Sequence, residues 1–118
     1  MPDVPKVLIV DDLAELERAL KRSARGKMQL LFALTLADGE RQFRENPDLA
    51  AICLDGCVEH QTLDTLPLLA LFRQSFTGPI VAIGSVSGDR EQMMANGCSH
   101  EVDMKHKLVP LLITLLNL

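Results

Sequence analysis

The feature that most constrains the fold is the regular alternation of short apolar runs with amphipathic segments. Four of the five runs are rich in Val, Ile or Leu, as is typical of strands that are buried on both faces of a sheet, and the fifth is weaker. Five such strands are expected, at Lys6–Val10, Gln29–Thr35, Ala50–Leu54, Ile80–Ile83 and Glu101–Met104. The alternation therefore favours an α/β fold over an all-helical or all-β one.

The intervening segments have the spacing of helices. Leu13, Leu16 and Leu20 fall on one helical face, and Thr65 is placed to cap the third helix. Helices are expected at Leu13–Ala24, at Ala37–Glu45, from Thr65 to about Phe72, at Ser87–Asn96 and at Lys107–Leu118. Five strand-then-helix units predict one domain over residues 1–118, with a doubly wound parallel sheet and helices on both faces.

Composition narrows the class of protein. Apolar residues make up 47% and charged residues 24% of the 118 residues, which is typical of a globular domain. The net charge of −4 argues against direct binding of nucleic acid. Three cysteines without a CxxC pair indicate neither a disulfide framework nor a zinc site. With neither a signal peptide nor an apolar run long enough to span a membrane, the expected location is the cytoplasm.

Acidic residues stand where two of the expected strands end. Asp11 and Asp12 follow the first strand and Asp55 follows the third. In doubly wound sheets the carboxyl ends of the strands meet at one edge, where ligands bind, so the three carboxylates are expected to converge there. Mutual repulsion would then raise at least one pKa unless a cation is bound. Mg²⁺ suits such a site because it prefers carboxylate oxygens and retains waters.

At these residues the sequence resembles the receiver domains of response regulators, in the CheY-like superfamily. The blocks that carry the resemblance span the chain: VLIVDD at Val7–Asp12, the stretch Ala37–Asp55, GPIVAIGS at Gly78–Ser85 and NGCSHEVDMK at Asn96–Lys105. The resemblance implies a flavodoxin-like fold with strand order 2-1-3-4-5. It also implies a switch without enzymatic turnover, at most self-phosphorylation and self-dephosphorylation that depend on Mg²⁺.

The resemblance also assigns roles to particular residues. Asp55 would accept a phosphoryl group from a histidine kinase or a phosphotransfer protein. Asp12, Asp55 and the backbone carbonyl of Cys57 would hold Mg²⁺, with Asp11 acting through a bound water. The phosphorylated domain would then change its interaction with an output domain or partner protein.

The sequence departs from the family in the residues that would sense the phosphoryl group. The position of the hydroxyl residue after the fourth strand falls on Gly84, with Ser85 one place later. The position of the lysine falls on Met104, with Lys105 one place later. Because neighbouring strand residues point to opposite faces, a shift of one place matters unless a bulge or a loop insertion restores the direction. Gly84, Ser85 and Lys105 are the candidates for sensing the phosphoryl group. The loop after Asp55 also has Glu59 where the family has proline, and it is about two residues longer.

These departures keep a second interpretation open, a receiver that is not phosphorylated and serves as a dimerisation or docking module. Two further classes fit less well. A flavin-binding electron carrier would need a phosphate-binding loop where Asp11 and Asp12 stand. A hydrolase with an aspartate nucleophile would have a second acid at the position of Cys57.

The last expected helix is apolar on nearly every face and shows no capping glycine before Leu118. A helix with one side in water does not need this pattern. A longer protein of which this is the N-terminal part, or a homodimer through the fourth and fifth helices, would explain it.

Overall fold

Five parallel strands form the central sheet of the computed structural model, which describes residues 4–118. Their order is β2-β1-β3-β4-β5, so the predicted fold class and strand order are confirmed. The strands are β1 (Lys6–Val10), β2 (Gln29–Ala33), β3 (Ala51–Asp55), β4 (Ile80–Ile83) and β5 (His100–Val102).

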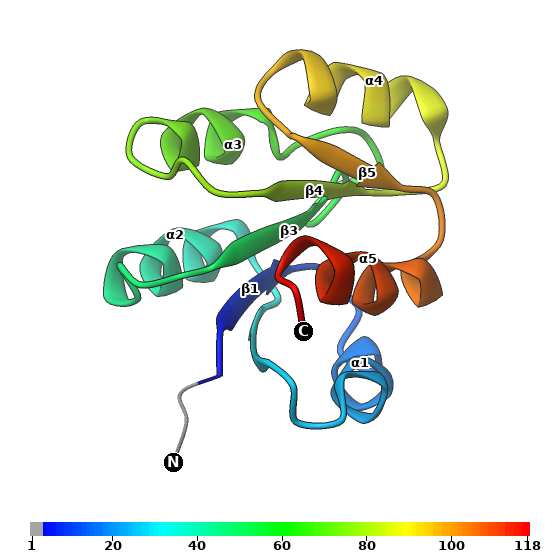
Figure 1. The fold of residues 1–118 in the computed structure, drawn as a ribbon. Helices are drawn as coiled ribbons and strands as arrows, with labels where there is room; N and C mark the ends of the chain where they lie inside the picture. The colour runs from blue at the N-terminus through cyan, green and yellow to red at the C-terminus, as the bar shows by residue number, and fades with distance from the viewer. Residues whose placement is uncertain (1–3) are drawn as a thin grey trace.

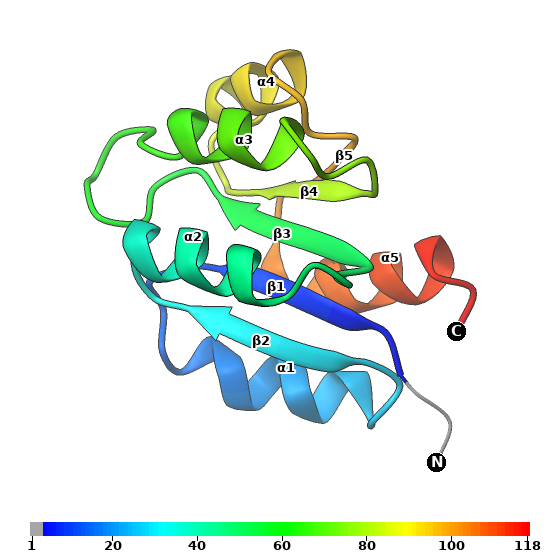
Figure 2. The same cartoon turned by 90° about the vertical axis from the view of Figure 1, so that its left-hand side faces the viewer.

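Helices cover both faces of the sheet (Figure 1). They are α1 (Leu16–Ala24), α2 (Leu36–Glu45), α3 (Leu66–Arg73), α4 (Ser87–Ala95) and α5 (Leu108–Leu115). Helices α1 and α5 lie together on one side, and α2 and α3 lie on the other, as the turned view in Figure 2 also shows. Within residues 4–118 no helix combines the length and the apolar character that crossing a bilayer requires.

The core consists of two apolar layers, one on each side of the sheet. Side chains of a strand alternate between its faces, so Val7 and Ile9 of β1 pack with α1 and α5, whereas Leu8 and Val10 pack with α2 and α3. Met93 of α4 is fully buried in the second layer. Burial on both faces explains why the strands read as continuous apolar runs.

The first helix begins three residues later than its spacing predicts. Asp11 is the cause, because its Oδ1 atom accepts a hydrogen bond of 2.9 Å from the backbone N–H of Leu13. The chain then makes a turn in which Leu16 N–H donates to Leu13 O over 3.1 Å. The apolar spacing of Leu13 therefore does not make it helical, and its side chain is exposed.

The C-terminal elements also differ from the sequence prediction. Strand β5 ends at Val102 and not at Met104, and a 3₁₀ turn at Lys105–Lys107 precedes α5. No glycine caps α5, but Asn117 serves in its place, because it takes the left-handed conformation with a φ of 56°. Leu118 N–H then donates to Ile113 O over 2.9 Å, which is the hydrogen bond of a Schellman cap.

Candidate functional site

Three carboxylates meet at the carboxyl edge of the sheet, where the neighbouring strands β1 and β3 end. Asp11 and Asp12 follow β1, and Asp55 is the last residue of β3. Val10 is in register with Leu54, so the residues that follow them lie at the same level. One oxygen from each of the three carboxylates lies within 4.8 Å of the others. The structure thus brings together the three aspartates on which the sequence argument depends.

Asp11 is the most deeply buried member of this acidic cluster, with 1% of its surface exposed. Its Oδ1 atom accepts the hydrogen bond from Leu13, whereas Oδ2 has no hydrogen-bond partner among the described residues. Asp12, by contrast, is exposed. A buried carboxylate oxygen without a hydrogen bond is costly, so a positive charge is needed beside it.

Lys105 supplies that charge. Its Nζ atom lies 2.8 Å from Asp11 Oδ2 and 3.6 Å from Asp55 Oδ2, which makes an ion pair although the contact with Asp11 lacks hydrogen-bond geometry. Burial alone would lower the pKa of Lys105, but the carboxylates of Asp11 and Asp55 raise it above its usual value. Lys105 is therefore held in its charged form. Met104, the residue at which the family pattern would place this lysine, is 53% exposed.

Asp55 has an unusual affinity for protons. Burial, followed by the charge of Asp11, raises the pKa of Asp55 to about 6, against the opposing effects of the Cys57 N–H and Lys105. Its Oδ1 atom accepts a hydrogen bond from Cys57 N–H over 3.3 Å. Its side chain remains 15% exposed. The sequence argument expected a raised pKa in at least one of the clustered carboxylates, and Asp55 is that residue.

The donor set of the acidic cluster fits a divalent cation of the magnesium type. All three side-chain donors are hard oxygens within 4.8 Å of one another, and Lys105 brings one positive charge to three carboxylates. Mg²⁺ is usually held by one or two carboxylates and several waters. Asp12 is exposed and Asp55 is partly exposed, so water can reach an ion bound to these carboxylates. Asp11, Asp12 and Asp55 are therefore the side chains that could hold a metal ion here.

Cys57, two residues after Asp55, lies in the loop that leads to α3. Its thiol is 3.7 Å from Asp89 Oδ2 at the start of α4. Burial, followed by the charges of Asp89 and Asp55, raises the pKa of the Cys57 thiol, so the sulfur remains protonated at neutral pH. Because hard cations prefer oxygen ligands, the donor that Cys57 would offer to Mg²⁺ is its backbone carbonyl.

Asp64 organises this loop in a way that the sequence prediction missed. Its carboxylate accepts hydrogen bonds from the backbone N–H groups of Val58 (2.9 Å), Glu59 (2.8 Å) and His60 (3.0 Å). Burial alone would raise the pKa of Asp64, but these hydrogen bonds and the His60 ring hold it below its usual value. Thr65 stands at the N-cap of α3 as expected, but its side chain makes no capping hydrogen bond. Its hydroxyl is buried and donates to Gly56 O over 3.2 Å.

Gly84 and Ser85 stand at and just after the position where the family has a hydroxyl residue. Gly84 has no side chain, and Ser85 is exposed. Within residues 4–118, neither makes a hydrogen bond to Asp55. Arg90, which the sequence analysis did not single out, donates to Gly84 O over 2.6 Å and to Glu101 Oε1 over 2.8 Å. Arg90 therefore ties the loop after β4 to β5.

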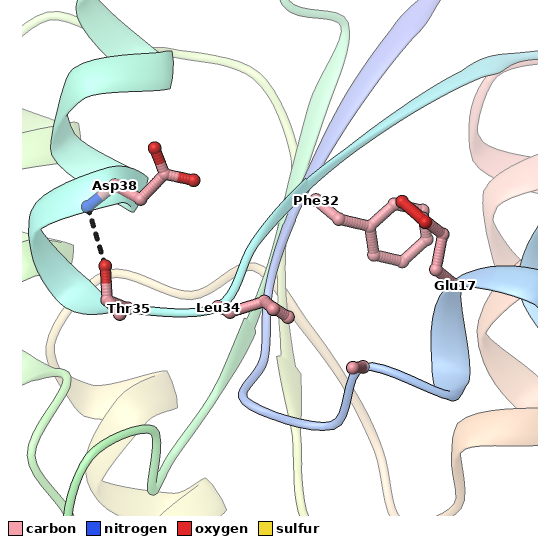
Figure 3. Close-up of a pocket in the computed structure, with 6 residues that line it drawn as sticks. Glu17, Phe32, Leu34, Thr35 and Asp38 are labelled. Atoms are coloured by element: carbon pink, nitrogen blue, oxygen red, sulfur yellow. Dashed lines mark hydrogen bonds between the residues drawn. The ribbon is translucent and has the colours of Figure 1, made fainter.

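A separate hollow of about 400 Å³ lies beside α1 and the connection from β2 to α2 (Figure 3). Phe32 and Leu34 give it apolar walls, and Glu17 lies at its side. Asp38 also lines it, but its backbone N–H is bound to the Thr35 hydroxyl that caps α2. None of the three clustered aspartates lines this hollow, so it is not the acidic cluster.

No protein-family model matches the chain, and no curated protein matches it. Solved structures do. The receiver protein of a response regulator from Pseudoalteromonas atlantica is 17% identical, with a TM-score of 0.81 over 96% of this chain and 98% of that chain. A two-component response regulator from Clostridium difficile is 18% identical, with a TM-score of 0.81 over 96% of each chain.

Chemotaxis protein CheY4 from Vibrio cholerae is 16% identical, with a TM-score of 0.78 over 96% of this chain and 99% of that chain. These similarities extend over almost the whole of each chain, and they agree with the strand order and helix layers described above. The chain therefore has the fold of response-regulator receiver domains.

Proposed function

We propose that this protein is the receiver domain of a two-component phosphorelay, in which Asp55 accepts a phosphoryl group from a histidine kinase or a phosphotransfer protein in the presence of Mg²⁺. One observation carries the proposal. Three carboxylates lie within 4.8 Å of one another at the end of β1 and β3, with the charged amine of Lys105 beside Asp11 and Asp55. This arrangement combines a nucleophile, a cation site and a counter-charge for the transferred group.

The chemistry requires an ionised Asp55. One of its oxygens attacks the phosphorus of a phosphohistidine, the P–O bond forms as the P–N bond breaks, and the freed imidazole nitrogen takes a proton from solvent. With a pKa of about 6, Asp55 is ionised in most molecules at pH 7. Asp11, Asp12 and Asp55, with the Cys57 carbonyl, would hold Mg²⁺, which supplies positive charge to the transferring phosphoryl group.

Lys105 would follow the transferred phosphoryl group. Its amine lies 3.6 Å from Asp55 Oδ2, and it stays charged because two carboxylates surround it. After transfer, two or more phosphoryl oxygens carry charge that Lys105 can pair with. Lys105 lies one residue after the position at which the family has its lysine. This shift does not argue against the role, because β5 ends at Val102 and the alternation of side chains between the two faces of a strand does not extend to Lys105.

Intact-mass analysis after incubation with acetyl phosphate tests the proposal. We expect one phosphoryl adduct that requires Mg²⁺ and disappears in Asp55→Asn or with a chelator. Asp48→Asn is the matched control, because it removes an exposed carboxylate that pairs with Lys6 away from the acidic cluster. An adduct on Asp55→Asn, or no adduct on the folded unaltered protein, would contradict the proposal.

A second candidate function is a docking module that works without phosphorylation. The position expected to carry the sensing hydroxyl is Gly84, and the exposed Ser85 makes no bond to Asp55 within the described residues, so the usual reporter of phosphorylation is missing. Partner binding that is equal for the unaltered protein and for Asp55→Asn, with or without acetyl phosphate, would favour this candidate.

The output would be a change in a protein interaction surface, read by an output domain or a partner protein in the cytoplasm. A homodimer through α4 and α5 is part of this proposal, because Leu111, Leu115 and Leu116 of the C-terminal segment remain only partly buried. Light scattering over a concentration series tests it. A monomer at every concentration, with and without acetyl phosphate, would remove the homodimer.

A further inference from the structure

We infer that Asp64 is a positioning residue for the metal site, because it orients the Cys57 carbonyl toward its role as a magnesium ligand. This inference rests on the proposed function and extends it to Asp64, which follows Asp55 by nine positions in the sequence. Asp64 lies just before α3 and touches none of the three clustered aspartates through a hydrogen bond within residues 4–118. Its effect on the metal site would therefore be indirect.

The Asp64 carboxylate is saturated with donors from one short segment. Oδ1 accepts the N–H of Val58, and Oδ2 accepts the N–H groups of Glu59 and His60. The ring of His60 lies 2.9 Å from the same Oδ2. Three consecutive backbone N–H groups that converge on one carboxylate fix the path of the loop immediately after Cys57. Hydrogen bonds to a charged acceptor are also stronger than those between neutral groups.

The peptide unit between Cys57 and Val58 links Asp64 to the metal site. A trans peptide is planar, and its C=O and N–H point in opposite directions. Because the Val58 N–H points at Asp64, the Cys57 C=O must point away from Asp64. The preceding peptide is fixed too, since the Cys57 N–H donates to Asp55 Oδ1 over 3.3 Å. Cys57 is thus held from both sides, by Asp55 and by Asp64.

The loop is anchored at a second point, which makes Asp64 part of a rigid arrangement. Glu59, the residue that replaces the family's proline, accepts a hydrogen bond of 2.7 Å from the N–H of Leu36 at the start of α2. Figure 2 shows the connection between β3 and α3 passing close to the beginning of α2. In this loop, which lacks the family's proline, the carboxylates of Glu59 and Asp64 hold the backbone in place. Asp64 acts on the Cys57 peptide and Glu59 acts on α2.

The Asp64→Asn substitution tests the inference, because asparagine has nearly the same size and shape as aspartate. Asparagine keeps one acceptor oxygen but replaces the other with an NH₂ group, which cannot accept from Glu59 or His60. We expect the dissociation constant for Mg²⁺, measured by NMR shifts during titration with MgCl₂, to rise by roughly tenfold, as is usual when a group that orients a metal ligand is lost. The measurement is made where both proteins are fully folded, so a change in stability alone does not alter it.

Two control variants separate orientation from charge. Glu59→Gln removes a negative charge from the same loop but keeps an oxygen that can accept from Leu36. His60→Ala removes only the ring contact with Asp64 and leaves the three backbone bonds. We expect both to change the dissociation constant by less than about twofold. An equal weakening by Asp64→Asn and Glu59→Gln would mean that charge alone is responsible, which would overturn the inference.

The outcomes also distinguish the inference from the function on which it rests. Mg²⁺ binding by the unaltered protein with no change in Asp64→Asn would overturn the inference and leave the proposed function standing. No Mg²⁺ binding by the unaltered protein would overturn both. Hydrogen exchange gives a second test that needs no variant. We expect the amides of Val58, Glu59 and His60 to be protected before Mg²⁺ is added, and exchange at free-peptide rates would overturn the inference.

Discussion

Replacing Asp55 with asparagine should stabilise the protein in the absence of metal ions. The fold raises the pKa of Asp55 to about 6, chiefly by burial and secondarily through the charge of Asp11. At 1.36 kcal/mol per pKa unit, this shift corresponds to an upper limit of about 3 kcal/mol against the ionised form. Solvent contact at the exposed part of the side chain reduces the cost, so we expect Asp55→Asn to gain about 1–2 kcal/mol at pH 7.5.

The gain should depend on pH in a defined direction. The folded-state pKa of Asp55 is above its unfolded value, so the fold favours the protonated form. Below the unfolded pKa, Asp55 is protonated in both states and the cost is absent. The cost appears as the pH rises and is complete above the folded pKa of about 6. The two proteins should therefore be similar in stability near pH 4 and differ most at pH 7 and above.

Urea denaturation with a chelator, followed by far-ultraviolet circular dichroism, measures this difference. A gain of about 1–2 kcal/mol should also raise the melting temperature by roughly 4–8 °C for a domain of this size. Saturating Mg²⁺ should reduce or reverse the advantage, because a ligand that binds only the folded state stabilises it. An Asp55→Asn variant equal to or less stable than the unaltered protein at pH 7.5 would refute the reasoning.

Three further predictions concern the ion pair beside Asp11 and two positions elsewhere in the fold. Lys105→Met leaves the buried Asp11 carboxylate without its counter-charge, so it should lower the free energy of unfolding by about 1–3 kcal/mol when a chelator is present. Mg²⁺ should restore this stability, and an equal loss with and without Mg²⁺ would contradict the prediction. Phe72→Ala empties a fully buried position and should cost about 3–5 kcal/mol in urea denaturation. Gly97 has a φ of +128°, and an added Cβ would meet a neighbouring side chain at 2.9 Å, so Gly97→Ala should lower the melting temperature. Gly88→Ala, where a Cβ meets open space, should not lower it.

The sheet and the acidic cluster could be predicted because they depend on short patterns and on a general property of parallel sheets. Lys6–Val10 and Ile80–Ile83 have the same bounds in the sequence analysis and in the structure. Asp11 and Asp55 could be expected to meet because the carboxyl ends of neighbouring parallel strands share one edge.

The sequence named Lys105 as a possible phosphoryl-sensing residue but could not decide between Lys105 and an empty lysine position at Met104, because the argument from alternating faces assumed a strand that reached Met104. Strand β5 ends two residues earlier, and a 3₁₀ turn brings Lys105 to the acidic cluster. The role of Asp64 was missed for a different reason. Its partners are backbone N–H groups, which every residue except proline carries, so the contact leaves no pattern of side chains. The capping by Asn117 had a signal, since asparagine also adopts the left-handed conformation.

Localisation of the phosphoryl group tests the central claim most directly. The protein is treated with acetyl phosphate and Mg²⁺ and then with borohydride, which reduces an aspartyl phosphate to homoserine, and the modified residue is identified by peptide mass spectrometry. We predict homoserine at position 55 alone, and none when Mg²⁺ is chelated. Homoserine at Asp11 or Asp12, or no reduced residue in a protein that remains folded, would contradict the assignment of Asp55 as the phosphoacceptor.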